Sequence, residues 1–303
     1  MQSFMTLMYH NVFRHQVFES LSPSVTSYFV DEITFENQMR SLVNLADCVS
    51  LSAVANFYLN AASEGSRRHE QESGIRRPQV QITFDDGWLG TVDIAAPILE
   101  RFGLCGTLFV TTDLIGRPHF VSQATLARLP SATLSVGSHG RSHRLLSQLS
   151  ENQIREELVS SKATLEDLLG REVASISIPG GAIDHRVRTI AAEAGYRLVF
   201  TSEVRPNRRA TSPLALGRVA IKQSTTMKDF RRFVEQRCQR EWVRRALLGI
   251  PKRVLGLKRY QKLRRSLLGE ERGQDEMLDI AECGLVEADE VNRPAESRES
   301  LKC

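Results

Sequence analysis

Two pairs of residues in this 303-residue chain have the types and the spacing to hold a metal ion. Asp85 and Asp86 directly follow the alternating apolar segment 80–84, which predicts a buried strand that ends in a glycine turn. His139 and His143 lie four residues apart and also follow an alternating apolar segment. Carboxylate and imidazole ligands with open coordination positions bind divalent transition metals, which polarise a carbonyl group and activate water.

Each pair also has an ordinary structural interpretation when it is taken alone. An Asp-Asp-Gly sequence is common in turns, because aspartate tolerates turn geometry and binds its own backbone. Two histidines four residues apart are typical of a solvated helix face. Both pairs stand at the predicted ends of strands in one region, and this favours the metal site over the two separate interpretations.

The elements that must position these residues predict an α/β fold with a parallel sheet, because strands alternate with helices. Since the motif residues all follow strands, a barrel-like closure with the site at the carboxyl ends of the strands is expected. The predicted strands are 80–84, 106–110, 173–178 and 198–202, and the predicted helices are 35–59, 92–102, 150–170 and 186–194.

The sequence Thr83-Phe84-Asp85-Asp86-Gly87, followed by His139-x-x-x-His143, resembles the first two motifs of the polysaccharide deacetylase family. This is the NodB-homology group of carbohydrate esterases (family 4-like), and the likeness covers roughly residues 4 to 225, with a first strand similar to that of exopolysaccharide and capsule members. The resemblance implies a distorted (β/α) barrel in which Asp85 is the catalytic base. It also implies that Asp86, His139 and His143 bind a divalent metal, expected to be zinc, with cobalt or nickel as alternatives.

The sequence departs from the family pattern where the family supplies its general acid. The late Leu-x-x-His motif is absent, because no histidine follows His185. Ser177 stands where the family usually has an arginine that tunes the catalytic aspartate, and Gly140 replaces a hydroxyl residue. We predict His10, at the end of the first strand, as the acid, with His185 as the other candidate. A packed, purely structural histidine is the alternative for His10.

Four further residues are predicted to contact substrate. Trp88 follows the aspartate motif and would either stack on a sugar ring or pack in the core. Pro179 and Gly180 form a turn after a predicted strand, and Arg218 lies in the stretch that replaces the late histidine motif.

Composition indicates one large α/β domain with an appendage, since the chain is 41% hydrophobic. Its five cysteines are odd in number and form no C-x-x-C motif, so we expect reduced thiols rather than a disulfide framework. The N-terminal residues lack a basic region and a long apolar run, which predicts a cytoplasmic protein without a signal peptide. We divide the chain into a deacetylase domain (1–236), a basic helical extension (237–269) and an acidic, disordered tail (270–303).

The basic extension has ten Lys or Arg residues and one acid between residues 240 and 268, interleaved with leucines. This pattern is typical of an interfacial helix on anionic lipid, and predicts peripheral contact with the inner face of the membrane. A helix packed on the barrel with a solvated basic face is the alternative. Nucleic-acid binding is not expected, because no recognised module is present.

Three functions remain open from the sequence. The first is a metal-dependent hydrolase that removes N-acetyl groups from a sugar in a polysaccharide, an oligosaccharide or a lipid-linked glycan precursor. The second is hydrolysis of another non-peptide C–N bond on the same fold. The third is a degenerate carbohydrate-binding protein, which the missing late histidine suggests and the intact aspartates and histidines oppose.

Overall fold

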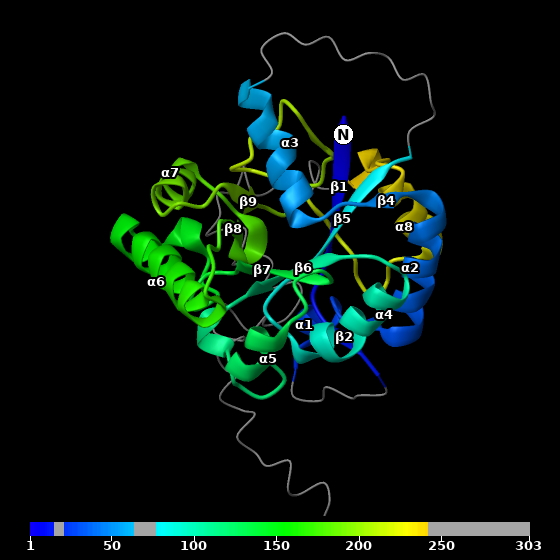
Figure 1. Cartoon of the computed structure of the whole chain (residues 1–303), viewed down its shortest axis with the longest axis horizontal. Coiled ribbons are helices and arrows are strands. Elements are labelled where there is room, and N and C mark those ends of the chain that lie inside the picture. Colours follow the sequence, from blue (N-terminus) through cyan, green and yellow to red (C-terminus); the bar gives the residue numbers. More distant parts are fainter. Residues whose placement is uncertain (15–20, 64–76, 242–303) are drawn as a thin grey trace, which may run out of the picture.

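The computed structural model describes residues 1–14, 21–63 and 77–241, and its centre is a curled, mainly parallel β-sheet (Figure 1). The central strands, in spatial order, are β1 (Ser3–Tyr9), β5 (Gln79–Phe84), β6 (Gly106–Val110), β7 (Leu134–Ser138), β8 (Ser175–Ser177) and β9 (Leu198–Phe200). Their residues are almost all buried, as expected for parallel strands that are covered on both faces.

Short strands complete the edges of this sheet and close its curl. Leu216 forms a parallel bridge with Phe200 of β9, and a few residues later the chain pairs with β1. The last strand thus returns to the first, and the sheet forms the incomplete, distorted barrel that the resemblance implied. The edge strands are β4 (Asp47–Cys48) beside β5, β10 (Asn207–Arg208) antiparallel to β1 and β11 (Val219–Ala220) parallel to β1, while β2 (Val12–Phe13) and β3 (Val30–Asp31) form a separate pair.

The helices are α1 (Pro23–Thr26), α2 (Glu32–Leu45), α3 (Leu51–Ser63), α4 (Ala96–Arg101), α5 (Gln123–Arg128), α6 (Glu151–Leu169), α7 (His185–Glu193) and α8 (Met227–Val234). Helices α6 and α7 pack together at the left of the barrel in Figure 1, and α2 packs with α4 and α8 at its right. A π-helical turn, Thr91–Ala95, leads into α4.

Helix α6 begins and ends as its sequence predicts. The hydroxyl of Ser150 accepts a hydrogen bond from the backbone N–H of Gln153, whose side chain accepts one from the backbone N–H of Ser150. Gly170 ends the helix with a φ of 62°, a left-handed conformation that glycine adopts without steric cost. The helix therefore offers a well-defined face to the neighbouring strand β7, with which it is in contact.

The main error in the predicted elements is the single helix over 35–59. The structure has two helices there, α2 and α3, because Asp47 and Cys48 pair with the start of β5 instead of continuing the helix. Tertiary pairing at a sheet edge outweighs local helix propensity at this point. Nearly all of the basic extension and the whole acidic tail lie outside the described residues. Within the described part of the chain, no helix has the length and apolar character needed to cross a membrane.

Candidate metal centre and active site

The predicted chemical residues meet at the carboxyl ends of the strands. Asp85 and Asp86 follow β5 and His139 follows β7, so the parallel order of the sheet brings them to one edge. They line a cavity of about 230 Å³ together with His143 and His10. The remaining lining residues are Met8, Ser24, Val25, Tyr28, Ile178, Gly180, Gly181, Ser202 and Arg218.

Asp86, His139 and His143 form a compact group whose ligand atoms all lie within 4.8 Å of one another. The Nε2 atoms of His139 and His143 lie 3.2 Å and 3.3 Å from the same oxygen, Oδ1 of Asp86. Asp86 and His139 are buried, while His143 is partly exposed to the cavity. The structure thus brings together the three residues that we predicted as ligands.

The hydrogen bonds of His139 show that this group fits a cation. Its Nδ1 lies 2.8 Å from the carbonyl oxygen of Ser177, and since a carbonyl only accepts, Nδ1 carries the proton. In the neutral ring, Nε2 then carries no proton, and its lone pair faces Asp86 Oδ1. This oxygen is buried and has no hydrogen-bond partner among the described residues. Two acceptors at this distance require a proton or a metal ion between them.

The charges of the group influence one another strongly. Burial alone would raise the pKa of Asp86, but the imidazoles of His139 and His143 bring that pKa well below its ordinary value. Burial acts to lower the pKa of His139, and the carboxylates of Asp85 and Asp86 outweigh it, so the net shift is upward. Both shifts indicate that a positive charge is favoured between the carboxylate and the imidazoles.

Two of the candidate ligands extend from unusual backbone conformations. Asp86 has a φ of 75° and His143 a φ of 60°, values that cost energy in residues other than glycine. The other oxygen of Asp86, Oδ2, accepts a hydrogen bond of 2.9 Å from Nε1 of Trp88, which leaves Oδ1 directed at the imidazoles.

A buried glutamate on α6 holds the loop between the two histidines. One carboxylate oxygen of Glu157 accepts hydrogen bonds of 2.9 Å from the backbone N–H groups of both Arg141 and Ser142. The other oxygen accepts a hydrogen bond from the Ser142 hydroxyl. Three contacts from one carboxylate thus fix the backbone from which His143 extends, although nothing in the sequence motif pointed to Glu157.

Both carboxylate oxygens of Asp85, the predicted base, accept hydrogen bonds from one buried arginine. Nη1 of Arg218 lies 2.7 Å from Oδ1 of Asp85 and Nη2 lies 2.8 Å from Oδ2, while the Ser177 hydroxyl also donates to Oδ2 at 3.2 Å. Burial would raise the pKa of Asp85, but the guanidinium of Arg218 and the nearby His139 lower it below the ordinary value. The fold therefore keeps this carboxylate ionised.

Arg218, which we predicted to contact substrate, lines the cavity, but its side chain is engaged by the protein itself. Its side chain is only 1% exposed, and its five N–H donors are directed at five protein acceptors. These acceptors are the two oxygens of Asp85, the hydroxyls of Thr83 and Ser177 and the carbonyl of Thr201. Arg218 positions Asp85, the predicted base, and its place at the seam between β9 and β1 could not be read from the local sequence.

Trp88 also differs from its prediction, because it is completely buried. Its ring lies 4.3 Å from that of Phe120 and 4.9 Å from that of Phe29, between centroids, so no face is open to a sugar. The core interpretation of Trp88 is the correct one, with the added contact to Asp86. Of the predicted turn residues, Gly180 lines the cavity, whereas Pro179 is buried and does not.

His10 lies in the wall of the same cavity, where its ring centroid is 4.5 Å from that of Tyr28. Burial lowers the pKa of His10, and the carboxylates of Asp86 and Asp85 offset only part of that effect. Its Nδ1 is buried and has no hydrogen-bond partner within the described part of the chain. The other candidate acid, His185, is the exposed first residue of α7 and does not line the cavity.

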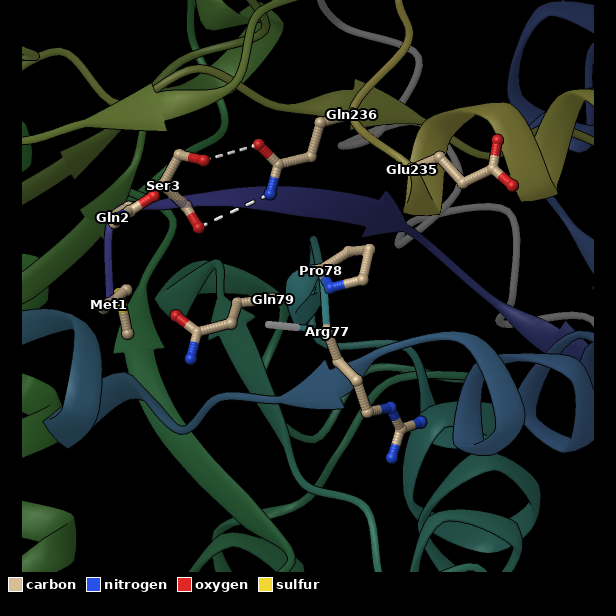
Figure 2. Close-up of a pocket in the computed structure, with 8 residues that line it drawn as sticks. All are labelled: Met1, Gln2, Ser3, Arg77, Pro78, Gln79, Glu235 and Gln236. Carbon is tan, nitrogen blue, oxygen red and sulfur yellow. Dashed lines mark hydrogen bonds between the residues drawn. The ribbon is translucent and has the colours of Figure 1, made fainter. Parts of the chain in front are cut away.

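A second cavity of about 230 Å³ lies at the opposite, amino ends of β1 and β5 (Figure 2). Its lining includes Arg77, Gln79 and Glu235, and the Gln236 amide is hydrogen-bonded to Ser3 on its border. It contains no histidine and none of the residues that we predicted for chemistry, so the candidate active site is the cavity at the carboxyl ends.

Comparison with known proteins agrees with this geometry. Residues 74–199 match the family model described as polysaccharide deacetylase. The Bacillus subtilis (strain 168) protein named "Putative polysaccharide deacetylase YxkH" is 27% identical over 156 residues, which are 52% of this chain and 56% of that protein. The matched region spans about half the length of the curated relatives.

Solved structures show the same fold. The Streptococcus pyogenes deacetylase PplD, in complex with acetate, has a TM-score of 0.64 at 22% identity, over 77% of this chain and 98% of its own. IcaB from Ammonifex degensii has a TM-score of 0.63 at 21% identity, over 78% of this chain and 97% of its own. The segment that matches the polysaccharide deacetylase model contains both aspartates and both histidines of the candidate site, and the solved structures share the fold that positions them.

Proposed function

We propose that the protein is a metal-dependent N-deacetylase of an N-acetylated sugar, carried by a polysaccharide, an oligosaccharide or a lipid-linked glycan precursor. The observation that carries this proposal is the pairing, in one cavity, of an ionised buried carboxylate, Asp85, with the Asp86, His139 and His143 group. Hydrolysis of an amide needs a base and an electrophilic centre beside the same carbonyl, and the cavity offers residues for both.

Asp86, His139 and His143 would hold the ion, which we propose to be zinc, with cobalt or nickel as alternatives. When bound, such an ion acts as a Lewis acid and lowers the pKa of water at its open positions. Two of these side chains are oriented for this role, Asp86 by Nε1 of Trp88 and His139 by the carbonyl of Ser177.

Asp85 would accept the proton of the attacking water, since its paired arginine keeps it ionised. His10 would donate a proton to the sugar nitrogen as the acetyl group leaves, because it lines the cavity outside the metal group; its lowered pKa means that it would have to gain this proton in the substrate complex. Gly180 and Gly181 also line the cavity, with φ values of 64° and 68°, and a side chain on Gly181 would collide with Ser202.

The test is amine release from a panel of N-acetylated oligosaccharides, with chelated protein and with protein resupplied with zinc, cobalt or nickel. We expect turnover only after a metal is resupplied, and loss of turnover in Asp85→Asn. Turnover of small non-sugar amides but of no oligosaccharide would support hydrolysis of another C–N bond instead. Sugar binding without any turnover would support a degenerate binding protein.

We also propose that residues 240–268 contact anionic membrane, which would place a cytoplasmic enzyme beside a lipid-linked precursor. This rests on the sequence alone, in which ten basic residues alternate with apolar ones. The full-length protein should sediment with vesicles that contain phosphatidylserine at low salt and should be released by high salt. A chain that lacks residues 240–303 should not sediment, and failure of the full-length protein to bind would refute the membrane contact.

A further inference from the structure

Two cysteine thiols lie in contact at the end of the barrel opposite the active site. The Sγ atoms of Cys48 and Cys105 are 3.8 Å apart, and Cys48 Sγ lies 3.2 Å from the carbonyl oxygen of Cys105. Cys48 is in β4, at the amino end of β5, and Cys105 directly precedes β6. The pair is separated by 57 residues in sequence, so the contact is a product of the fold.

The sheet register explains why these thiols meet. On one side of β5, Cys48 is paired with Val80 and Gly106 is paired with Ile82, while β1 occupies the other side. Strand β6 therefore begins where β4 ends, on the same side of β5, and Cys105 falls opposite the residue between Val80 and Ile82. The two cysteines are thus about one residue apart along the sheet, a spacing of about 3.3 Å in a parallel strand.

This placement is compatible with a disulfide bond. The two sulfur atoms already lie side by side, although the cysteines are 57 residues apart in the sequence. Sulfur atoms at 3.8 Å must approach further to bond, and a rotation of the side chains supplies such movement without a change in the sheet register.

The environment of the two thiols also gives them different pKa values. The hydrogen bond from Cys48 lowers the pKa of Cys105 to about 7, whereas the same contact and burial raise the pKa of Cys48. Both residues are partly exposed, so small reagents can reach them. Cys105 is therefore the expected nucleophile, because the thiolate rather than the thiol attacks a disulfide.

We propose that Cys48 and Cys105 form a reversible intramolecular disulfide. This redox-sensitive cross-link would join β4 to the start of β6, at the end of the barrel opposite the active site. With glutathione disulfide as the oxidant, the Cys105 thiolate attacks one sulfur and releases one glutathione thiolate, which leaves a mixed disulfide. The Cys48 thiol then loses its proton and attacks the Cys105 sulfur, releasing the second glutathione. Two protein thiols are oxidised and one glutathione disulfide is reduced to two thiols.

The test uses the full chain, treated with glutathione disulfide and then alkylated under denaturing conditions. Before alkylation the linked protein should be lighter by two hydrogens, and after it neither Cys48 nor Cys105 should carry an alkyl group. One proteolytic product should link the Cys48 and Cys105 peptides and disappear on reduction. The melting temperature should rise by something on the order of 5–10 °C, because the bond closes a long loop in the unfolded chain. Linkage of other cysteines, or an unchanged melting temperature in the linked protein, would overturn the proposal.

Matched variants separate this bond from non-specific oxidation. In Cys48→Ser, Cys105 should stop at a single glutathione adduct, and in Cys105→Ser the reaction at Cys48 should be much slower. A chain with Cys238→Ala, Cys283→Ser and Cys303→Ser keeps only the pair and should still form the bond. If this chain acquires two glutathione adducts and no internal link, the two thiols cannot reach each other and the proposal fails.

Discussion

The buried pair of Arg218 and Asp85 predicts a large and specific loss of stability when the arginine is removed. Arg218→Met keeps much of the side-chain volume but deletes the guanidinium. It leaves a carboxylate that is 3% exposed and has, among the described residues, only the Ser177 hydroxyl as a side-chain donor. Removing one partner of a buried ion pair costs about 3–5 kcal/mol, because the remaining charge is uncompensated. For a domain of this size, such a loss lowers the melting temperature by roughly 6–20 °C.

The assay is thermal or urea unfolding of chelated protein, so that metal binding does not contribute. A suitable control is Arg197→Met, because Arg197 also forms a two-pronged pair, with Glu172 at 2.7 Å and 2.7 Å, but on the surface. The two side chains of that pair are 54% and 53% exposed, and an exposed pair contributes only about 0–1 kcal/mol. The two substitutions therefore compare the same geometry in two environments.

A double-mutant cycle isolates the interaction itself. Asp85→Asn removes the charge that Arg218→Met would strand, so the double variant should be less destabilised than the sum of the single ones. Coupled residues differ from additivity by about 0.5–3 kcal/mol, and we expect the upper part of that range here. The reasoning is refuted if Arg218→Met costs no more than Arg197→Met, or if the two changes at the site simply add.

Three further predictions concern the metal group. His143→Ala should lose metal on dialysis, as measured by elemental analysis, whereas His185→Ala, on the surface, should keep it; equal metal content in both would refute the ligand assignment. Asp85→Asn should keep its metal and lose turnover, and a variant that hydrolyses at the wild-type rate would mean that the base lies elsewhere. Glu157→Ala should weaken metal affinity by roughly 10–100-fold, because the loop before His143 loses three contacts, while the exposed neighbour Glu156→Ala should not.

The sequence predicted that Asp86, His139 and His143 lie together, because the signals of this group are local. Asp86, His139 and His143 all stand at or just past the ends of apolar strands, and parallel strands deliver such positions to one edge of a sheet. The place of Trp88 was ambiguous because it depends on residues far away in the sequence. The sequence beside the aspartate motif is the same whether the ring faces the cavity or the core. Only the packing of Phe29 and Phe120 against it decides between them.

The helix over 35–59 was wrong for a related reason. Its apolar positions fit a helical period, but the five-residue break that admits β4 depends on a partner strand more than thirty residues later. The role of Glu157 also depends on tertiary structure, because a glutamate in the middle of an amphipathic helix is usually solvent-exposed. Its burial, at 6% exposure, becomes meaningful only when the loop with Arg141 and Ser142 is placed beside it.

Arg218 shows how the fold replaces a residue that the family pattern places elsewhere. Ser177, at the end of β8, stands where the family usually carries an arginine, and its small side chain leaves space beside Asp85. Because the sheet curls until the segment before β11 reaches β1, Arg218 enters that space from the other side of the seam. Its Nη2 donates to the Ser177 hydroxyl at 2.7 Å, so the serine and the arginine act on the carboxylate together. The carboxylate requires a buried, forked donor, and the closure of the barrel allows a different strand to supply it.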